Sequence, residues 1–168
     1  MKKTLSITVY NEPGVLTRIS TVFSSRNFNI DSIAVGPTEN KGISKIILVL
    51  PGDNQILEQM TKQLNKLIQI IEVKDITSCP CVERELMLIK VKSSPQVRSE
   101  ILEIAQIFRS KIVDISDISL TIEVTGDPGK ISTIEELLQR YSILQIVRTG
   151  KICLERELGI NTEYLKSI

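Results

Sequence analysis

Residues 5–23 of the chain, LSITVYNEPGVLTRISTVF, contain an alternating segment, a turn and an amphipathic segment in direct succession. In the first part Leu5, Ile7 and Val9 alternate with polar residues, which is the periodicity of a half-buried β-strand. After the break NEPG, apolar residues recur at the spacing of a helix with one buried face: Val15, Leu16, Ile19, Val22 and Phe23. The stretch therefore predicts a strand that enters a helix through a short turn.

The turn before this predicted helix is a candidate anion site. Asn11 or Glu12 is expected to begin the helix, and Pro13 suits its first turn. Backbone N–H groups at a helix start bind small anions, including the carboxylate of an amino acid. Gly14 has no side chain, so a ligand can approach the backbone closely. On spacing alone, a helix start without a ligand remains the favoured interpretation, because short motifs match by chance.

The composition limits the classes of function. The chain has 168 residues, enough for one large or two small domains, and its 42% hydrophobic residues suffice for a core. A net charge of +1 and 4% aromatic residues argue against nucleic acid and against an anionic membrane surface as partners. No apolar run has the length of a transmembrane helix, and the first residues lack the pattern of a signal peptide. We therefore expect an intracellular protein.

The sequence offers few candidates for catalysis or metal binding. The absence of histidine excludes Ser-His-Asp and Cys-His nucleophiles and histidine-ligated metals. Cys79, Cys81 and Cys153 form no disulfide framework, and the CPC spacing lacks the further ligands of a zinc site. We interpret Cys79 and Cys81 as linker residues and predict no catalytic residue and no metal site. A binding or regulatory protein is favoured.

Each half of the chain has the same predicted order of elements, βαββαβ. In the first half these are residues 5–9, 13–26, 30–35, 43–50, 56–68 (with Asp53 as the helix cap) and 70–76. In the second half the strands are residues 86–91, 111–115, 118–124 and 144–154, the last kinked at Gly150. Its two helices begin at Ser94-Pro95 and at the turn GDPG, residues 126–129.

Two such halves predict an α+β protein with two ferredoxin-like domains, each an antiparallel sheet with both helices on one face. We place the first domain at residues 1–78, a linker at 79–82, the second domain at 83–158 and a loosely held tail at 159–168. The uncovered sheet faces and edge strands predict an oligomer.

Several blocks of the chain resemble the regulatory (small) subunits of acetolactate synthase. These are TLSITVYNEPGVLTRISTVFSSRNFNIDSIAVGPTE (residues 4–39), CVERELMLIKV (81–91), RSKIVDIS (109–116), TIEVTGDPGKI (121–131) and IVRTGKICLERE (146–157). The resemblance implies that the first domain is an ACT domain that forms a homodimer and binds valine at the ACT–ACT interface. Implied ligand contacts are the turn from Asn11 through Pro13, Gly14 and Val15 to Leu16, with Asn29 and Ile30 from the opposing subunit.

The residues themselves are compatible with such a site. Backbone amides after Pro13 can hold a carboxylate, and the side-chain oxygens of Asn11 and Asn29 can accept from an ammonium group. An apolar wall for the isopropyl group is expected from Leu16, Ile30 and Val35. One methylene group changes affinity by only about 1–3 kcal/mol, so leucine and isoleucine are expected as weak competitors.

The resemblance further implies a large catalytic subunit as partner, which carries thiamine diphosphate, magnesium and FAD. That subunit condenses two pyruvates, or pyruvate with 2-oxobutanoate, on the route to valine, leucine and isoleucine. This chain is then a non-catalytic subunit without a cofactor of its own, which activates the catalytic subunit and confers feedback inhibition by valine. The closing NTEYLKSI is similar to cyanobacterial-type members, which implies the plastid stroma if the chain is plastid-encoded and the bacterial cytoplasm otherwise.

Other functions remain open at the level of sequence. A stand-alone ACT-type sensor would bind an amino acid and act on another enzyme or on a regulator. The sequence shows no DNA-binding helix pair, which disfavours this possibility. A ferredoxin-like RNA-binding module is disfavoured by the missing aromatic residues on the strands and by the neutral charge. An enzyme is disfavoured because nothing assembles into a catalytic group.

Overall fold

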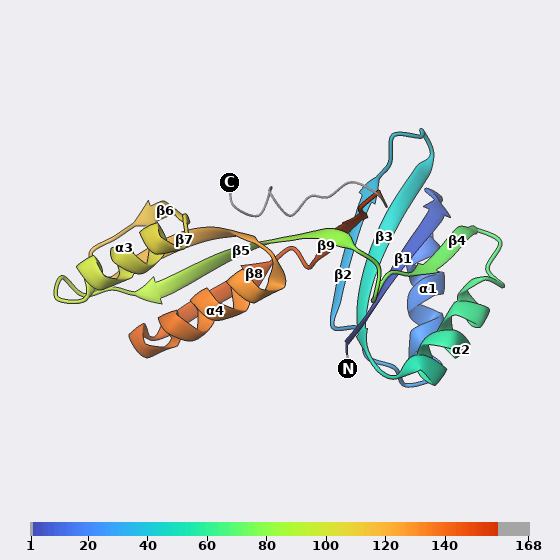
Figure 1. Ribbon diagram of the computed structural model, residues 1–168, viewed down its shortest axis with the longest axis horizontal. Helices are drawn as coiled ribbons and strands as arrows, with labels where there is room; N and C mark the ends of the chain where they lie inside the picture. Colours follow the sequence, from blue (N-terminus) through green and yellow to red (C-terminus); the bar gives the residue numbers. More distant parts are fainter. Residues whose placement is uncertain (1, 158–168) are drawn as a thin grey trace.

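The computed structural model describes residues 2–157, which form two α+β domains in succession (Figure 1). The tail predicted at residues 159–168, and the predicted end of the second domain at residue 158, lie outside the described residues. The two domains stand side by side, and extended segments of the chain connect them.

The first domain has the predicted order βαββαβ. Its elements are β1 (Lys2–Tyr10), α1 (Val15–Ser24), β2 (Ser32–Pro37), β3 (Ile43–Pro51), α2 (Asn54–Leu64) and β4 (Ile70–Asp75). Neighbouring strands are antiparallel in the order β2-β3-β1-β4. Alternate residues of β1 and β3 pack with both helices in one core, so the period-two pattern of the sequence is confirmed. The strand members of this core are Leu5, Ile7, Val9, Ile46, Leu48 and Leu50.

The second domain repeats this arrangement with a core of its own. Its elements are β5 (Cys81–Lys92), α3 (Arg98–Ile107), β6 (Lys111–Ile115), β7 (Ser119–Gly126), α4 (Pro128–Leu138), a 3-10 turn η1 (Gln139–Tyr141) and β8 (Ile143–Arg148). The antiparallel order β6-β7-β5-β8 corresponds to that of the first sheet. The predicted pair of ferredoxin-like domains is therefore confirmed. Within residues 2–157, no helix is both long and apolar enough to cross a membrane.

Two helices begin as predicted, with an aspartate cap. The Asp53 carboxylate accepts a hydrogen bond from the Ile56 amide at 3.0 Å, and the Asp127 carboxylate accepts one from the Lys130 amide at 2.9 Å. The latter confirms the GDPG segment as a helix-initiating turn, with Pro128 at the first helical position. Such caps typically contribute about 1 kcal/mol to stability.

The strands at the domain junction differ from the prediction. β5 begins at Cys81 rather than Leu86, so residues 81–82 of the predicted linker 79–82 belong to a strand. The predicted strand 144–154 is divided into β8 and β9 (Ile152–Glu155), because Gly150 turns the chain with φ +79°. β8 pairs with the second half of β5, whereas β9 pairs with residues 81–84. We call residues 81–84 and 152–155 the β5/β9 ribbon.

A truncation of the first core tests its contribution to stability. Phe23 is 1% exposed in α1, and Phe23→Ala should lower the free energy of unfolding by about 3–5 kcal/mol because it leaves a cavity. Ile68 is 88% exposed, so Ile68→Ala should change it by no more than about 0.5 kcal/mol. Urea unfolding measures both. Equal losses would contradict the assignment of Phe23 to the core.

Candidate functional site

A surface hollow of about 360 Å³ lies at the start of α1. The turn after β1, the first turn of α1 and the end of β2 surround it, and residues of β1 and β3 complete its lining. We call it the α1 hollow. Five of the eight predicted ligand contacts line it: Asn11, Gly14, Val15, Leu16 and Val35.

The helix start at this hollow is uncapped, contrary to the expectation for Asn11 or Glu12. The N-cap residue is Gly14, with φ +85° and no side-chain hydrogen bond to the first turn. Asn11 and Glu12 are still held at the strand end, since their amides donate to the carbonyl oxygens of Gly42 and Tyr10. An uncapped first turn leaves amides that can bind an anion. Val15 is already engaged, because its amide donates to the Glu12 carbonyl oxygen at 3.4 Å.

Gly14 is required by its backbone conformation. A Cβ atom at this position meets nothing within 4 Å, so a larger residue has space. The left-handed φ of +85° nevertheless strains any residue with a side chain, by about 1–2 kcal/mol. The same open space lets a ligand reach the backbone of the turn.

The side of the hollow formed by α1 and β2 is apolar. Leu16 is 43% exposed and Val35 is 52% exposed, although both are large hydrophobic residues. Val15 is buried beneath them in the first core. The hollow thus joins a polar helix start to a partly exposed apolar wall, as expected of a site for a small amphiphilic ligand.

Three predicted contacts do not line the hollow within one chain. Pro13 is exposed in the turn but is absent from the lining. Asn29 is exposed, and Ile30 packs partly against the first core, in the segment before β2. β2 begins at Ser32, so Ile30 precedes the strand in which it was predicted. The assignment of Asn29 and Ile30 to an opposing subunit stays a prediction.

Other residues of the lining were not predicted. They are Val9, Tyr10, Glu12, Thr17, Gly36, Pro37, Ser44 and Ile46. Strand register brings several of them to the site, because Val35 lies opposite Ile46 and Pro37 lies opposite Ser44. The nearly continuous apolar run of residues 43–50 predicts a strand, but it does not predict which residues of β2 lie opposite those of β3. No local signal in the sequence could have found the contacts from β3, Ser44 and Ile46, whereas Glu12 lies within the predicted turn.

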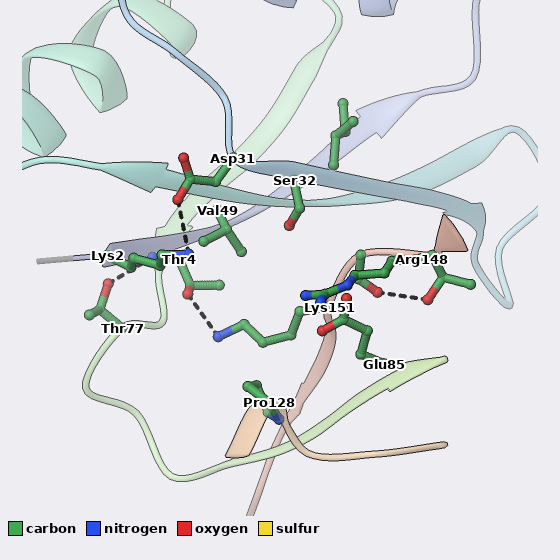
Figure 2. Close-up of a pocket in the computed structure, with 13 residues that line it drawn as sticks. Lys2, Thr4, Asp31, Ser32, Val49, Thr77, Glu85, Pro128, Arg148 and Lys151 are labelled. Atoms are coloured by element: carbon green, nitrogen blue, oxygen red, sulfur yellow. Dashed lines mark hydrogen bonds and ion pairs between the residues drawn. The ribbon is translucent and has the colours of Figure 1, made fainter. Parts of the chain in front are cut away.

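A larger hollow, of about 470 Å³, lies between the two domains (Figure 2). Lys151 extends across it to Thr4, and Lys2 lies beside Asp31 at a distance of 3.2 Å. Arg148 pairs with the Glu135 carboxylate, and Lys151 lies 2.7 Å from a carboxylate oxygen of Glu83. These basic side chains are thus engaged by carboxylates of the chain itself. We assign no ligand to this hollow.

The three cysteines lie near the domain junction as free thiols. Cys79 precedes β5, while Cys81 and Cys153 lie in the two strands of the β5/β9 ribbon rather than in a linker. Burial raises the pKa of the Cys153 thiol to about 11 and also raises that of Cys81. Both thiols are therefore protonated at neutral pH, the unreactive form. Among residues 2–157, no cluster of cysteine or acidic residues could hold a metal ion.

Both domains match family models. Residues 84–157 match a model described as the small subunit of acetolactate synthase, and residues 5–72 match one described as an AHAS small subunit-like ACT domain. A crystal structure of an acetolactate synthase small subunit from Thermotoga maritima matches with a TM-score of 0.84 and 36% sequence identity. That match covers 94% of this chain and 98% of the other.

Curated relatives agree with these matches. The chain is 47% identical over 156 residues to a probable acetolactate synthase small subunit of Archaeoglobus fulgidus, covering 93% of this chain and 98% of that protein. It is 46% identical over 163 residues to acetolactate synthase small subunit 2, chloroplastic, of Arabidopsis thaliana. The latter match covers 97% of this chain but spans only 34% of the plant protein. By these similarities, the chain belongs to the acetolactate synthase small-subunit family.

Proposed function

We propose that this chain is the regulatory subunit of an acetolactate synthase and that its first domain binds valine where two copies meet. The observation that carries the proposal is the uncapped start of α1, which opens into a hollow with an apolar wall. A free amino acid needs this combination, because it has a carboxylate at one end and here a hydrocarbon side chain at the other.

Each group of valine has a counterpart in the hollow. The carboxylate is held by the unpaired amides of the turn and of the first turn of α1, beside Gly14 and Leu16. The ammonium group donates to the side-chain oxygen of Asn11. The isopropyl group packs against Leu16 and Val35, which removes apolar surface from water.

A second copy completes the site in this proposal. β2 is an edge strand, and its Ile33 and Val35 are exposed large hydrophobic residues. A partner that covers this apolar surface brings its own Asn29 and Ile30 to the ligand. Valine then stabilises one arrangement of the dimer over another, which is the differential affinity that feedback inhibition requires.

The catalytic subunit is the second partner. In this proposal it holds thiamine diphosphate, magnesium and FAD and condenses pyruvate with pyruvate or 2-oxobutanoate, while this chain activates it. The second domain and the segment around the linker contribute to that contact. The chloroplastic and bacterial names of its relatives support a location in the plastid stroma or the bacterial cytoplasm.

Thermal unfolding with and without valine tests the ligand. At about a hundred times its dissociation constant, valine should stabilise the folded chain by roughly 2.7 kcal/mol, which raises the melting temperature measurably. Leucine and isoleucine should give smaller shifts and glutamate none, because only the first two fit the apolar wall. Absence of a shift with any of these amino acids would contradict valine binding by the isolated subunit.

Two substitutions should separate activation from inhibition. Gly14→Asp places a carboxylate where the ligand carboxylate binds, and Asn29→Ala removes the contact offered to the partner's ligand. We expect both variants to activate the catalytic subunit fully and to lose inhibition by valine in an acetolactate assay.

Gly42→Asp is the matched control for Gly14→Asp. Gly42 also has a left-handed φ, +79°, and open space around an added Cβ, but it does not line the α1 hollow. Inhibition by valine should therefore survive in this variant. Joint loss of activation and inhibition in Gly14→Asp and Asn29→Ala, with Gly42→Asp unaffected, would show that the two roles are not separable.

A further inference from the structure

We infer that β9 couples the α1 hollow to the second domain through the end of β2, an inference that rests on the proposed function. The β5/β9 ribbon lies against the sheet of the first domain, on the face opposite to its helices. A ligand in the α1 hollow would thereby bias how firmly this ribbon is docked.

The end of β2 is a wall shared by two hollows. Val35, Gly36 and Pro37 line the α1 hollow, and they also line a hollow of about 230 Å³ whose other members include Ile152 and Cys153 of β9. Ala34 and Ile47 belong only to the second hollow, which places it on the face of the sheet away from the core. A shift of Val35–Pro37 on ligand binding is therefore transmitted directly to β9. Among residues 2–157, β2 is an edge strand that pairs with β3 alone, and an edge strand with one neighbour can shift more easily than a central strand.

Polar contacts fasten the ribbon to the first sheet. The largely buried Lys151 donates to the Thr4 hydroxyl oxygen at 3.1 Å (Figure 2). It also donates to a Glu83 carboxylate oxygen at 2.7 Å. Lys74 of β4 forms an ion pair with Glu155 of β9. These contacts involve few groups, and hollows remain beside them, so docked and loosened states of the ribbon can interconvert.

The other end of the path is the central sheet of the second domain. β5 is one continuous strand, in which residues 81–84 pair with β9 and residues 85–92 pair with β7. The same strand pairs with β8. A change in the docking of the ribbon therefore acts on the strand around which the second sheet is built.

Hydrogen exchange of the full chain tests the inference without any substitution. With saturating valine, backbone amides of residues 11–17 should exchange more slowly because they contact the ligand. Amides of the β5/β9 ribbon should also slow, because its docked state is favoured. Protection of 11–17 alone would overturn the coupling and leave valine binding intact, whereas no protection in either segment would overturn both proposals.

The Cys153 thiol offers a second, chemical measure of docking. Cys153 is half-buried beside the first sheet, so loosening of the ribbon should speed its alkylation by iodoacetamide. Valine should slow the alkylation of Cys153, followed by peptide mass spectrometry. An unchanged rate, with valine binding confirmed by protection of residues 11–17, would contradict the coupling.

Substitutions of lysines that hold the ribbon test the coupling in the opposite direction, from the ribbon to the α1 hollow. Lys151→Met should loosen the ribbon, speed alkylation of Cys153 and weaken valine binding, because coupling between two sites is reciprocal. A decrease in affinity of about 5-fold or more would fall in the range of known allosteric couplings. Lys151→Arg, which keeps a charged donor, should restore part of the effect.

Lys74→Met is the second variant, in case Lys151→Met folds poorly. It breaks the ion pair with Glu155 at the other end of β9 and should act in the same direction. Lys62→Met is the matched control, because it breaks an exposed ion pair with Glu58 within α2 and leaves the ribbon untouched. Equal valine affinity in Lys74→Met, Lys62→Met and the unchanged chain would overturn the inference.

Discussion

A four-stranded sheet with both helices on one face leaves its other face to be covered by something else, and this constraint governs the architecture. In the first domain, the chain itself covers the face of the sheet that carries no helices. Thr4, Ser6, Ile47 and Val49 lie on the face without helices, yet all are buried. The chain returns from the second domain to bond Lys151 to Thr4 and to place Cys153 beside Ile47. The second sheet keeps Leu88 and Val147 exposed on the equivalent face. Within residues 2–157, the chain therefore covers the helix-free face of the first sheet and leaves that of the second sheet partly exposed.

Of the four α-helices among residues 2–157, two begin with an aspartate cap and two begin without a side-chain cap. Asp53 and Asp127 cap α2 and α4 by local hydrogen bonds, and such caps stabilise a helix. α1 begins instead at Gly14, whose left-handed backbone places no side chain over the first turn. α3 also begins without a side-chain cap, at Val97, so α1 is distinguished by the combination of an uncapped start with a hollow, where unsatisfied amides can act as binding groups. The physical features that weaken this helix start are the same ones that support the proposed valine site.

Polar contacts join the β5/β9 ribbon to the first sheet at defined points. The exposed pair of Lys74 and Glu155 is expected to contribute no more than about 1 kcal/mol, as surface ion pairs generally do. Its significance is geometric, because it and Lys151 fix where β9 lies on the first sheet. An attachment of this kind holds one arrangement without making it irreversible. Such an attachment would suit the proposed regulation, in which the relation between the two domains responds to a small ligand.

The sequence predicted the order βαββαβ and the fold of both domains, because strand alternation, helical stripes and aspartate caps are local patterns that survive in isolation. The family resemblance predicted Asn11, Gly14, Val15 and Leu16 as ligand contacts, an apolar wall was expected to include Val35, and in the structure these five residues line one hollow. Tertiary structure alone decided that Ser44 and Ile46 join this site, since register depends on which strands pair. It alone decided that residues 144–154 divide at Gly150 and that β9 returns to the first sheet. Those features depend on contacts between residues far apart in the chain, which no short window of sequence contains.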